Sequence, residues 1–232
     1  MIRSVIALTF VSVCVLFAGA SPQKIAPTPA TSLPRCGPLI QLVLSCPLLG
    51  FTYKVPFGWV DRTDDMNQRI TSDTPHDPPS ANPEGSRQTS SNTTSKTLLA
   101  VFERPPETQG DTINSAVIIA IEERSLYPQI KTAADYFGPL SEIAAERGLK
   151  MDGDPYWFAV GGKRVARADF TSGGEKSSAQ QTSLVLLEKS YILSFTFLAG
   201  SGDEIDSLAA NLTFTAGVRK PRSKSGTPDK SR

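Results

Sequence analysis

The stretch YWFAVGGKRVARADF, residues 156–170, decides the fold prediction. It contains two runs rich in aromatic and β-branched residues, and Gly161 and Gly162 stand between them. Both glycines can adopt the positive φ angles that a tight two-residue turn requires. The stretch therefore predicts a β-hairpin, and with it an antiparallel sheet.

The same pattern recurs along the chain. β-Branched and aromatic residues, bounded by turn formers, predict further strands. Residues 183–197 repeat the hairpin design around Glu188, Lys189 and Ser190, and the strand at their end has one richly apolar face and one mixed face. The remaining strands are expected at residues 51–55, 97–104 and 113–123. The two hairpins and these three segments together predict seven strands that pair mostly in antiparallel fashion.

Two segments carry helix signals. The first begins with the capping pair Thr132 and Asp135, runs to Gly148 and is interrupted by Pro139, which is expected to kink or restart it. Its predicted apolar face comprises Tyr136, Leu140, Ile143 and Ala144. The second begins with the Ser201 and Glu204 box and is expected to bury Ile205, Leu208 and Leu212. Helices packed on the sheet make the predicted fold class α+β, an α/β/α sandwich.

The N-terminus predicts export. Arg3 precedes an apolar run at residues 5–17, which the small residues Ala18, Gly19 and Ala20 follow. This is typical of a secretory signal peptide, here residues 1–20, and the run is too short to cross a bilayer, which takes roughly 20 residues. We therefore expect a secreted or periplasmic protein without stable membrane insertion. Residues 21–34, rich in Pro, Thr, Ala and Ser, are expected to form a disordered linker.

Two cysteines remain in the mature chain, because Cys14 departs with the signal peptide. In an oxidising compartment an even number of cysteines usually pairs, so Cys36 and Cys46 are expected to form a structural disulfide. A helix or a strand would hold their Cα atoms too far apart. The intervening chain must therefore double back, and Gly37 and Pro38 are the expected bend.

Composition places the mature chain among ordinary globular proteins, since 39% of all residues are hydrophobic and 20% are charged. We expect a single domain over residues 35–215, which includes a long polar loop at residues 61–96. Residues 216–232 are expected to form a disordered tail, and from Val218 onward they carry six basic residues and one acidic residue. The folded body is consequently acidic, which argues against a nucleic-acid surface.

The search for reactive groups predicts no catalytic, cofactor or metal site. The single histidine, His76, lies in the polar loop without the G-x-S-x-G turn of a serine hydrolase. Asp61, Asp64, Asp65, Asp73 and Asp77 lack the spacing of an EF-hand, which favours a solvated acidic loop over a weak Ca²⁺ site. Glu122 with Glu123, and Asp152 with Asp154, give no reason to prefer a glycosidase pair. The chain is therefore expected not to be an enzyme.

Three aromatic residues are candidates for a partner surface: Trp59, Tyr156 and Trp157. Tyr156 and Trp157 point to opposite faces of their strand, so one is expected to enter the core while the other meets a helix or solvent. An exposed aromatic pair would make a binding hot spot. For Trp59 the expected role is packing, with residues 56–58 turning the chain so that its ring covers the end of the sheet.

The order of these elements resembles the PsbP-like family, which includes bacterial envelope proteins of the DcrB type. The resemblance rests on VPFGW at residues 55–59, IKTAADYF at 130–137, VGGKRVARADF at 160–170, YILSFTF at 191–197 and DEIDSLAANLTF at 203–214. It covers about residues 47–215, and the polar insertion and the cysteine pair depart from it. The resemblance implies an antiparallel sheet between helices, in non-enzymatic proteins that assist or bind larger complexes.

Three functions follow as hypotheses. The leading one is an exported non-enzymatic module that binds or assembles with an envelope protein. The alternative is a carrier of a small apolar ligand or a metal ion, and the third is a hydrolase. A recovered protein partner favours the first, and a small molecule bound to the purified chain favours the second.

Overall fold

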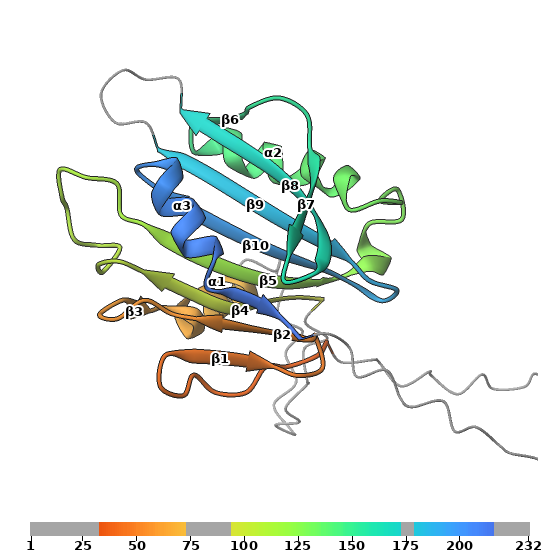
Figure 1. Cartoon of the computed structure of the whole chain (residues 1–232), viewed down its shortest axis with the longest axis horizontal. Coiled ribbons are helices and arrows are strands. Elements are labelled where there is room, and N and C mark those ends of the chain that lie inside the picture. Colours follow the sequence, from red (N-terminus) through yellow and green to blue (C-terminus); the bar gives the residue numbers. More distant parts are fainter. Residues whose placement is uncertain (1–32, 73–93, 173–178, 216–232) are drawn as a thin grey trace, which may run out of the picture. The chain divides into compact units, whose positions relative to one another are not determined.

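The computed structural model describes residues 33–72, 94–172 and 179–215 (Figure 1). The predicted signal peptide, most of the predicted linker and the basic tail lie outside these residues, as does His76. The described chain forms an antiparallel eight-stranded sheet, a three-stranded sheet and helices, so the predicted α+β class is confirmed. Within the described residues no helix combines the length and the apolar character needed to cross a membrane.

The large sheet has the order β3-β4-β5-β10-β9-β8-β6, and β7 also pairs with β8. The predicted hairpin is confirmed: Gly161 and Gly162 have φ angles of 53° and 80°, and Val160 pairs with Lys163. The second predicted hairpin is confirmed around Glu188, whose N–H donates to the carbonyl of Tyr191. The strands are β3 (Val60–Asp61), β4 (Ser95–Phe102), β5 (Ala116–Glu123), β6 (Leu149–Met151), β7 (Tyr156–Val160), β8 (Lys163–Ser172), β9 (Gln180–Leu187) and β10 (Tyr191–Ala199).

One face of the large sheet carries the larger core. The small sheet, in the order β1-β2-β11, packs on this face together with α3 (Gly202–Ala209). Its strands are β1 (Val43–Cys46), β2 (Phe51–Lys54) and β11 (Leu212–Phe214). Phe195 of β10 meets Phe51 and Phe214 edge to face, with ring centroids 5.1 and 5.8 Å away. The predicted helical layer on this face therefore includes a second sheet. Its strand β2 was predicted at residues 51–55, whereas β1 and β11, with four and three residues, were not predicted.

The opposite face carries a second core beneath the 3-10 helix η2 (Ala134–Tyr136) and α2 (Phe137–Glu146), which Figure 1 shows behind the sheet. The predicted cap is present, because the carboxylate of Asp135 accepts hydrogen bonds from the N–H groups of Lys131 and Thr132. Pro139 falls in the first turn of α2, where a missing N–H costs nothing. The prediction for Ile143 was wrong: it is 49% exposed, and the buried face of α2 consists of Phe137, Leu140 and Ala144.

Helix α3 begins as predicted, with the hydroxyl of Ser201 accepting a hydrogen bond from the N–H of Glu204. The capping box is not reciprocal, because the Glu204 carboxylate accepts instead from the buried hydroxyl of Ser115 at 2.5 Å. Ile205 and Leu208 are buried as predicted, but Leu212 belongs to β11 rather than to the helix. The helix ends three residues earlier than its apolar pattern suggests.

The polar stretch at residues 61–96 is not a loop throughout, which corrects the prediction. Helix α1 (Thr63–Ser72) occupies its beginning, and strand β4 starts at Ser95. Asp61 caps α1 by accepting from the N–H and the hydroxyl of Thr63. The helix covers the edge of β4 through polar groups: the Asn67 amide bonds both the N–H and the carbonyl of Thr97. A helix that docks by hydrogen bonds needs no apolar stripe, so its sequence looks like a loop.

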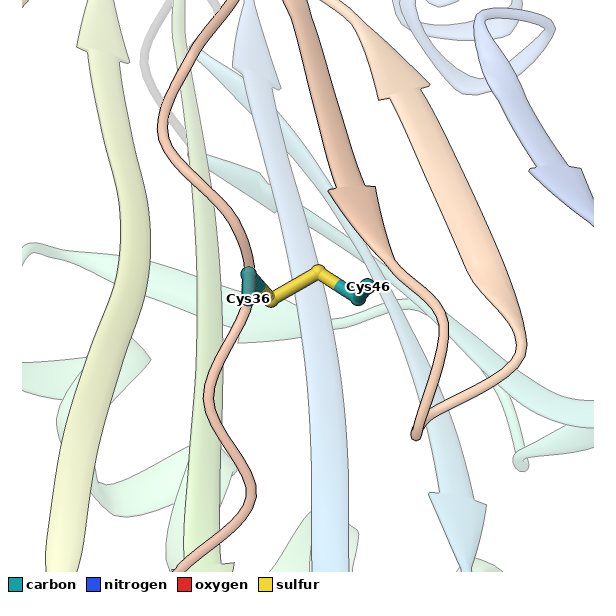
Figure 2. The surroundings of a disulfide bond; sticks show 2 residues. All are labelled: Cys36 and Cys46. Atoms are coloured by element: carbon teal, nitrogen blue, oxygen red, sulfur yellow. A yellow bond between two sulfur atoms is a disulfide. The ribbon is translucent and has the colours of Figure 1, made fainter.

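The predicted disulfide joins Cys36 and Cys46, whose Cα atoms are 4.2 Å apart (Figure 2). The bend between them lies at Gln41 and Leu42, not at Gly37 and Pro38 as predicted. Gln41 and Leu42 have φ angles of 48° and 63°, and Ile40 and Val43 exchange two backbone hydrogen bonds around them. Gly37 instead donates to the carbonyl of Ser45, so residues 37–40 run along β1 and cover its edge.

Candidate interaction surface

Strand β7 presents the two most accessible aromatic side chains of the large sheet. Tyr156 is 44% exposed and Trp157 is 49% exposed. Tyr156 lies opposite Arg167 of β8, and Trp157 lies opposite Ala166. Because successive residues of a strand point to opposite faces, the two rings stand on either side of β7. They offer two adjacent contact surfaces around one strand rather than a single flat patch.

Trp157 stacks with an arginine of the neighbouring strand. The guanidinium carbon of Arg164 lies 4.3 Å from the centroid of the Trp157 ring, within the range of a cation–π contact. Arg164 is exposed, and within residues 33–72, 94–172 and 179–215 no carboxylate forms an ion pair with it. This face of β7 therefore combines a large apolar ring with an accessible positive charge.

On the other face of β7, Tyr156 joins a polar network built on Asp169. The carboxylate of Asp169 accepts from the Tyr156 hydroxyl at 2.7 Å, from Nε of Arg167 at 3.0 Å and from the Thr182 hydroxyl at 2.5 Å. Arg167 also donates to Asp206 of α3 at 3.3 Å. The Arg167 side chain is only 13% exposed, and its guanidinium lies over the Phe158 ring. The network holds β7, β8, β9 and α3 together at this point.

The network shifts the pKa values of its members. Burial raises the pKa of the Asp169 carboxyl, but the hydrogen bonds from Thr182, Tyr156 and Arg167 outweigh burial and lower it below its ordinary value. Burial and the hydrogen bond to Asp169 both raise the pKa of Tyr156. Asp169 is therefore a carboxylate and Tyr156 a neutral donor at neutral pH, which is the charge state that the hydrogen bonds require.

Asp169→Asn is expected to lower the free energy of unfolding at pH 7 by about 1 to 2 kcal/mol, because it removes a charged acceptor from three donors. A carboxyl whose folded pKa is lowered stabilises the fold above its unfolded pKa, about 3.9, and loses that contribution as the pH falls through the folded pKa. The difference in the free energy of unfolding between wild type and variant should therefore be largest at pH 7 and should disappear in acid. Urea unfolding between pH 7 and pH 3 measures it.

Asp154→Asn is the matched control for this experiment, since Asp154 is exposed and makes no side-chain hydrogen bond in the described part of the chain. Its stability should follow that of the wild type at every pH. A difference between Asp169→Asn and wild type that stays constant down to pH 3 would contradict a role for the ionised carboxylate.

Trp59 does not share the surface of the other two aromatic residues. It is partly buried against the larger core, next to β3, and Gly58 before it has a φ of 84°. Strand β3 lies at one edge of the large sheet, whereas β7 pairs with β8 near the other edge. The packing role predicted for Trp59 agrees with this position, and the structure separates it from Tyr156 and Trp157.

Three of the other carboxylates considered from the sequence, Glu122, Asp61 and Asp65, have structural partners. Glu122 accepts hydrogen bonds from the hydroxyls of Tyr127 and Tyr136, and burial together with Glu122 raises the pKa of Tyr127 to about 12. Asp61 caps α1, and Asp65 forms an ion pair with Arg62. Among the described residues no three His, Cys, Asp or Glu side chains gather as a metal site would require.

The sequence prediction named Tyr156 and Trp157, but its expectation that one of them enters the core was wrong, because both are exposed, and it missed the charged residues beside them. Arg164 and Arg167 could have been found, because a two-residue turn at Gly161 and Gly162 fixes which residues of β7 and β8 face each other. Asp206 carried no such signal. It reaches Arg167 from α3, 39 residues further along the chain, and only the packing of α3 on the sheet brings the two together.

Comparisons with known proteins give similarities of fold. No family model and no curated protein matches the chain. The solution structure of a PsbP from Synechocystis is similar over 82% of this chain and 98% of that chain, with 11% identity and a TM-score of 0.42. The structure of LpqN, which is involved in cell envelope biogenesis of Mycobacterium tuberculosis, is similar over 72% of this chain and 83% of LpqN, with 15% identity and a TM-score of 0.33. A Pseudomonas aeruginosa protein of unknown function is similar over 44% of this chain and 78% of its own chain, with 17% identity and a TM-score of 0.27.

Proposed function

We propose that this chain is an exported, non-enzymatic module that binds a protein of the cell envelope, and that it contacts this partner through Trp157 and Tyr156 on β7. The observation that carries the proposal is the pair of half-exposed aromatic rings, each beside an arginine, on a strand with no charged residue of its own. Tryptophan, tyrosine and arginine are the residues most enriched in the energetic centres of protein interfaces.

The rigidity of the surface supports this role. The Tyr156 hydroxyl is fixed by Asp169, and the Trp157 ring is fixed by Arg164, so little side-chain entropy is left to lose on binding. The disulfide between Cys36 and Cys46 suits the oxidising compartment that the N-terminal signal predicts. A rigid, aromatic, uncharged strand in an exported protein fits recognition of another protein.

Trp157→Ala tests the proposal. The mature chain, immobilised through its C-terminus, is exposed to envelope extract from its own organism, and retained proteins are identified by mass spectrometry. Wild type should retain one or a few proteins, and Trp157→Ala should bind them at least about tenfold more weakly, the effect of truncating a hot-spot residue. Phe57→Ala is the control, because Phe57 is 92% exposed and lies outside this surface; it should bind like wild type.

Two results would contradict the proposal. One is equal retention of the same proteins by wild type and Trp157→Ala, which would place the interface elsewhere. The other is the absence of any retained protein together with a small molecule or metal ion bound to the purified chain in native mass spectrometry. That second result would support the carrier function instead.

A further inference from the structure

Strand β7 has an open hydrogen-bonding edge. Val160 and Lys163 flank a two-residue turn and therefore exchange both backbone hydrogen bonds. In an antiparallel pair such residues alternate with residues whose N–H and C=O groups point away from the partner strand. On β7 the outward-pointing residues are Trp157 and Ala159, both exposed, and no backbone bond within the described residues reaches them.

Two other strand edges of the described chain are covered, those of β4 and β1. Asn67 and Thr63 of α1 bond the backbone of β4, where Asn67 pairs with Thr97 and the Thr63 hydroxyl accepts from the N–H of Ala100. Residues 37–40 cover β1 and are held there by the disulfide. Proteins usually protect an edge strand with charge, proline or a covering segment. The sequence of β7, YWFAV, contains no charge and no proline, so its edge is accessible to another strand.

The positive charge of Arg164 beside the edge of β7 favours a bound strand that carries a negative charge. Arg164 pairs with Ala159 across the β7–β8 ladder. Neighbouring strands lie about 4.8 Å apart, so a residue opposite Ala159 on an added strand would have its Cα roughly 10 Å from that of Arg164. The small side chain of Ala159 leaves the space between them free. An acidic side chain at that position would meet the guanidinium of Arg164 above the sheet.

We propose that β7 binds an extended, carboxylate-bearing segment of the partner protein as an added strand. The segment exchanges backbone hydrogen bonds with Trp157 and Ala159, packs an apolar side chain beside Trp157 and places an aspartate or glutamate over Arg164. This mode of recognition is β-strand addition, in which the backbone supplies affinity and alternate side chains supply specificity. The inference rests on the proposed function, because it specifies how the same surface holds its partner.

Two other occupants fit the edge less well. A second copy of the chain, paired through β7, would place Trp157 opposite Ala159 and bring no carboxylate to Arg164, since β7 has none. The chain's own C-terminal segment, residues 218–232, carries six basic residues and one acidic residue and would bring positive charge to Arg164. A carboxylate-bearing segment of a different protein complements the edge best.

Selection from a phage library of random eight-residue peptides tests the inference. Peptides selected on the wild-type chain should be rich in β-branched residues and carry an aspartate or glutamate. Arg164→Glu should weaken their binding at least about tenfold, through loss of attraction and gain of repulsion. Ala159→Pro removes an outward N–H without touching the β7–β8 ladder and should weaken binding similarly, whereas the matched control Ala159→Ser, which keeps the N–H, should bind like wild type.

Amide hydrogen exchange of the wild-type chain gives a readout that does not depend on the folding of any variant. On addition of a selected peptide, the N–H groups of Trp157 and Ala159 should exchange at least about tenfold more slowly, since strand addition buries them in hydrogen bonds. The N–H groups of Phe158 and Val160, already bonded to β8, should change little. Unchanged exchange at Trp157 and Ala159 would overturn the inference.

Further outcomes separate this inference from the proposed function. An empty selection, or selected peptides without acidic residues, would overturn the acidic-strand model. A wild-type dimer that Ala159→Pro dissociates in sedimentation would identify a second copy as the occupant and equally overturn it. If the envelope protein retained through Trp157 binds Ala159→Pro as well as wild type, strand addition is wrong while the binding function stands.

Discussion

Phe195→Ala is expected to lower the free energy of unfolding by about 3 to 5 kcal/mol, the usual loss when a buried phenylalanine is truncated. Phe195 is fully buried, and its ring meets Phe51 and Phe214 edge to face. It thus joins β10 of the large sheet to β2 and β11 of the small sheet. The variant loses the apolar contact area of the ring and leaves a cavity between two sheets that cannot both move inward.

Thermal unfolding followed by circular dichroism measures this effect. For a chain of this size, each kcal/mol shifts the midpoint by about 2 to 4 °C, so a decrease of roughly 6 to 20 °C is expected. Phe57→Ala is the matched control, because the same truncation at a side chain that is 92% exposed removes almost no contact. A shift for Phe195→Ala as small as that for Phe57→Ala would show that the two sheets do not depend on this contact.

Loss of the disulfide is expected to lower the free energy of unfolding by about 2 to 4 kcal/mol. The bond closes a short loop, with a separation of 10 residues, and fixes a segment whose turn residues Gln41 and Leu42 both have positive φ. Non-glycine residues adopt this conformation only when the surroundings enforce it. Without the bond, residues 37–40 should detach from β1 more readily and expose the edge that they cover.

The replacement of both Cys36 and Cys46 by alanine, compared with reduction of the wild type, tests this expectation. Both should lower the unfolding midpoint by a similar amount, and the reductant should have no effect on the double alanine variant. Faster amide exchange should appear at Ser45 of β1 before it appears in β9 or β10. An unchanged midpoint after complete reduction, verified by thiol titration, would contradict a stabilising role for the bond.

The sequence was most informative where a local rule is strict. The pair Gly161 and Gly162 predicted the β7–β8 hairpin, because glycine adopts positive φ angles without the steric strain that other residues incur. The caps at Asp135 and Ser201 were predicted because short polar side chains satisfy the free N–H groups of a first helical turn. The pairing of Cys36 with Cys46 was predicted from their number and from the oxidising compartment that the N-terminal sequence predicts.

The sequence failed where distant parts of the chain supply the stabilisation. Helix α1 is polar and docks through Asn67 on Thr97, so no apolar period marks it. The bend at Gln41 and Leu42 has no glycine, and the disulfide and the β1–β2 pairing hold it in place. Strands β6 and β11 each have three residues, which is too few for an alternating pattern to identify.

The sequence by itself determined the fold class, the main hairpins, the disulfide partners and two of the aromatic residues of the surface, since each depends on residues close together in the chain or on a simple count. Only the tertiary structure decided that the edge of β7 is open among the described residues, that Arg164 lies on Trp157 with no carboxylate partner in that part of the chain, and that Asp206 forms an ion pair with Arg167. Accessibility and charge pairing depend on every element that packs nearby, and a local pattern does not contain that information.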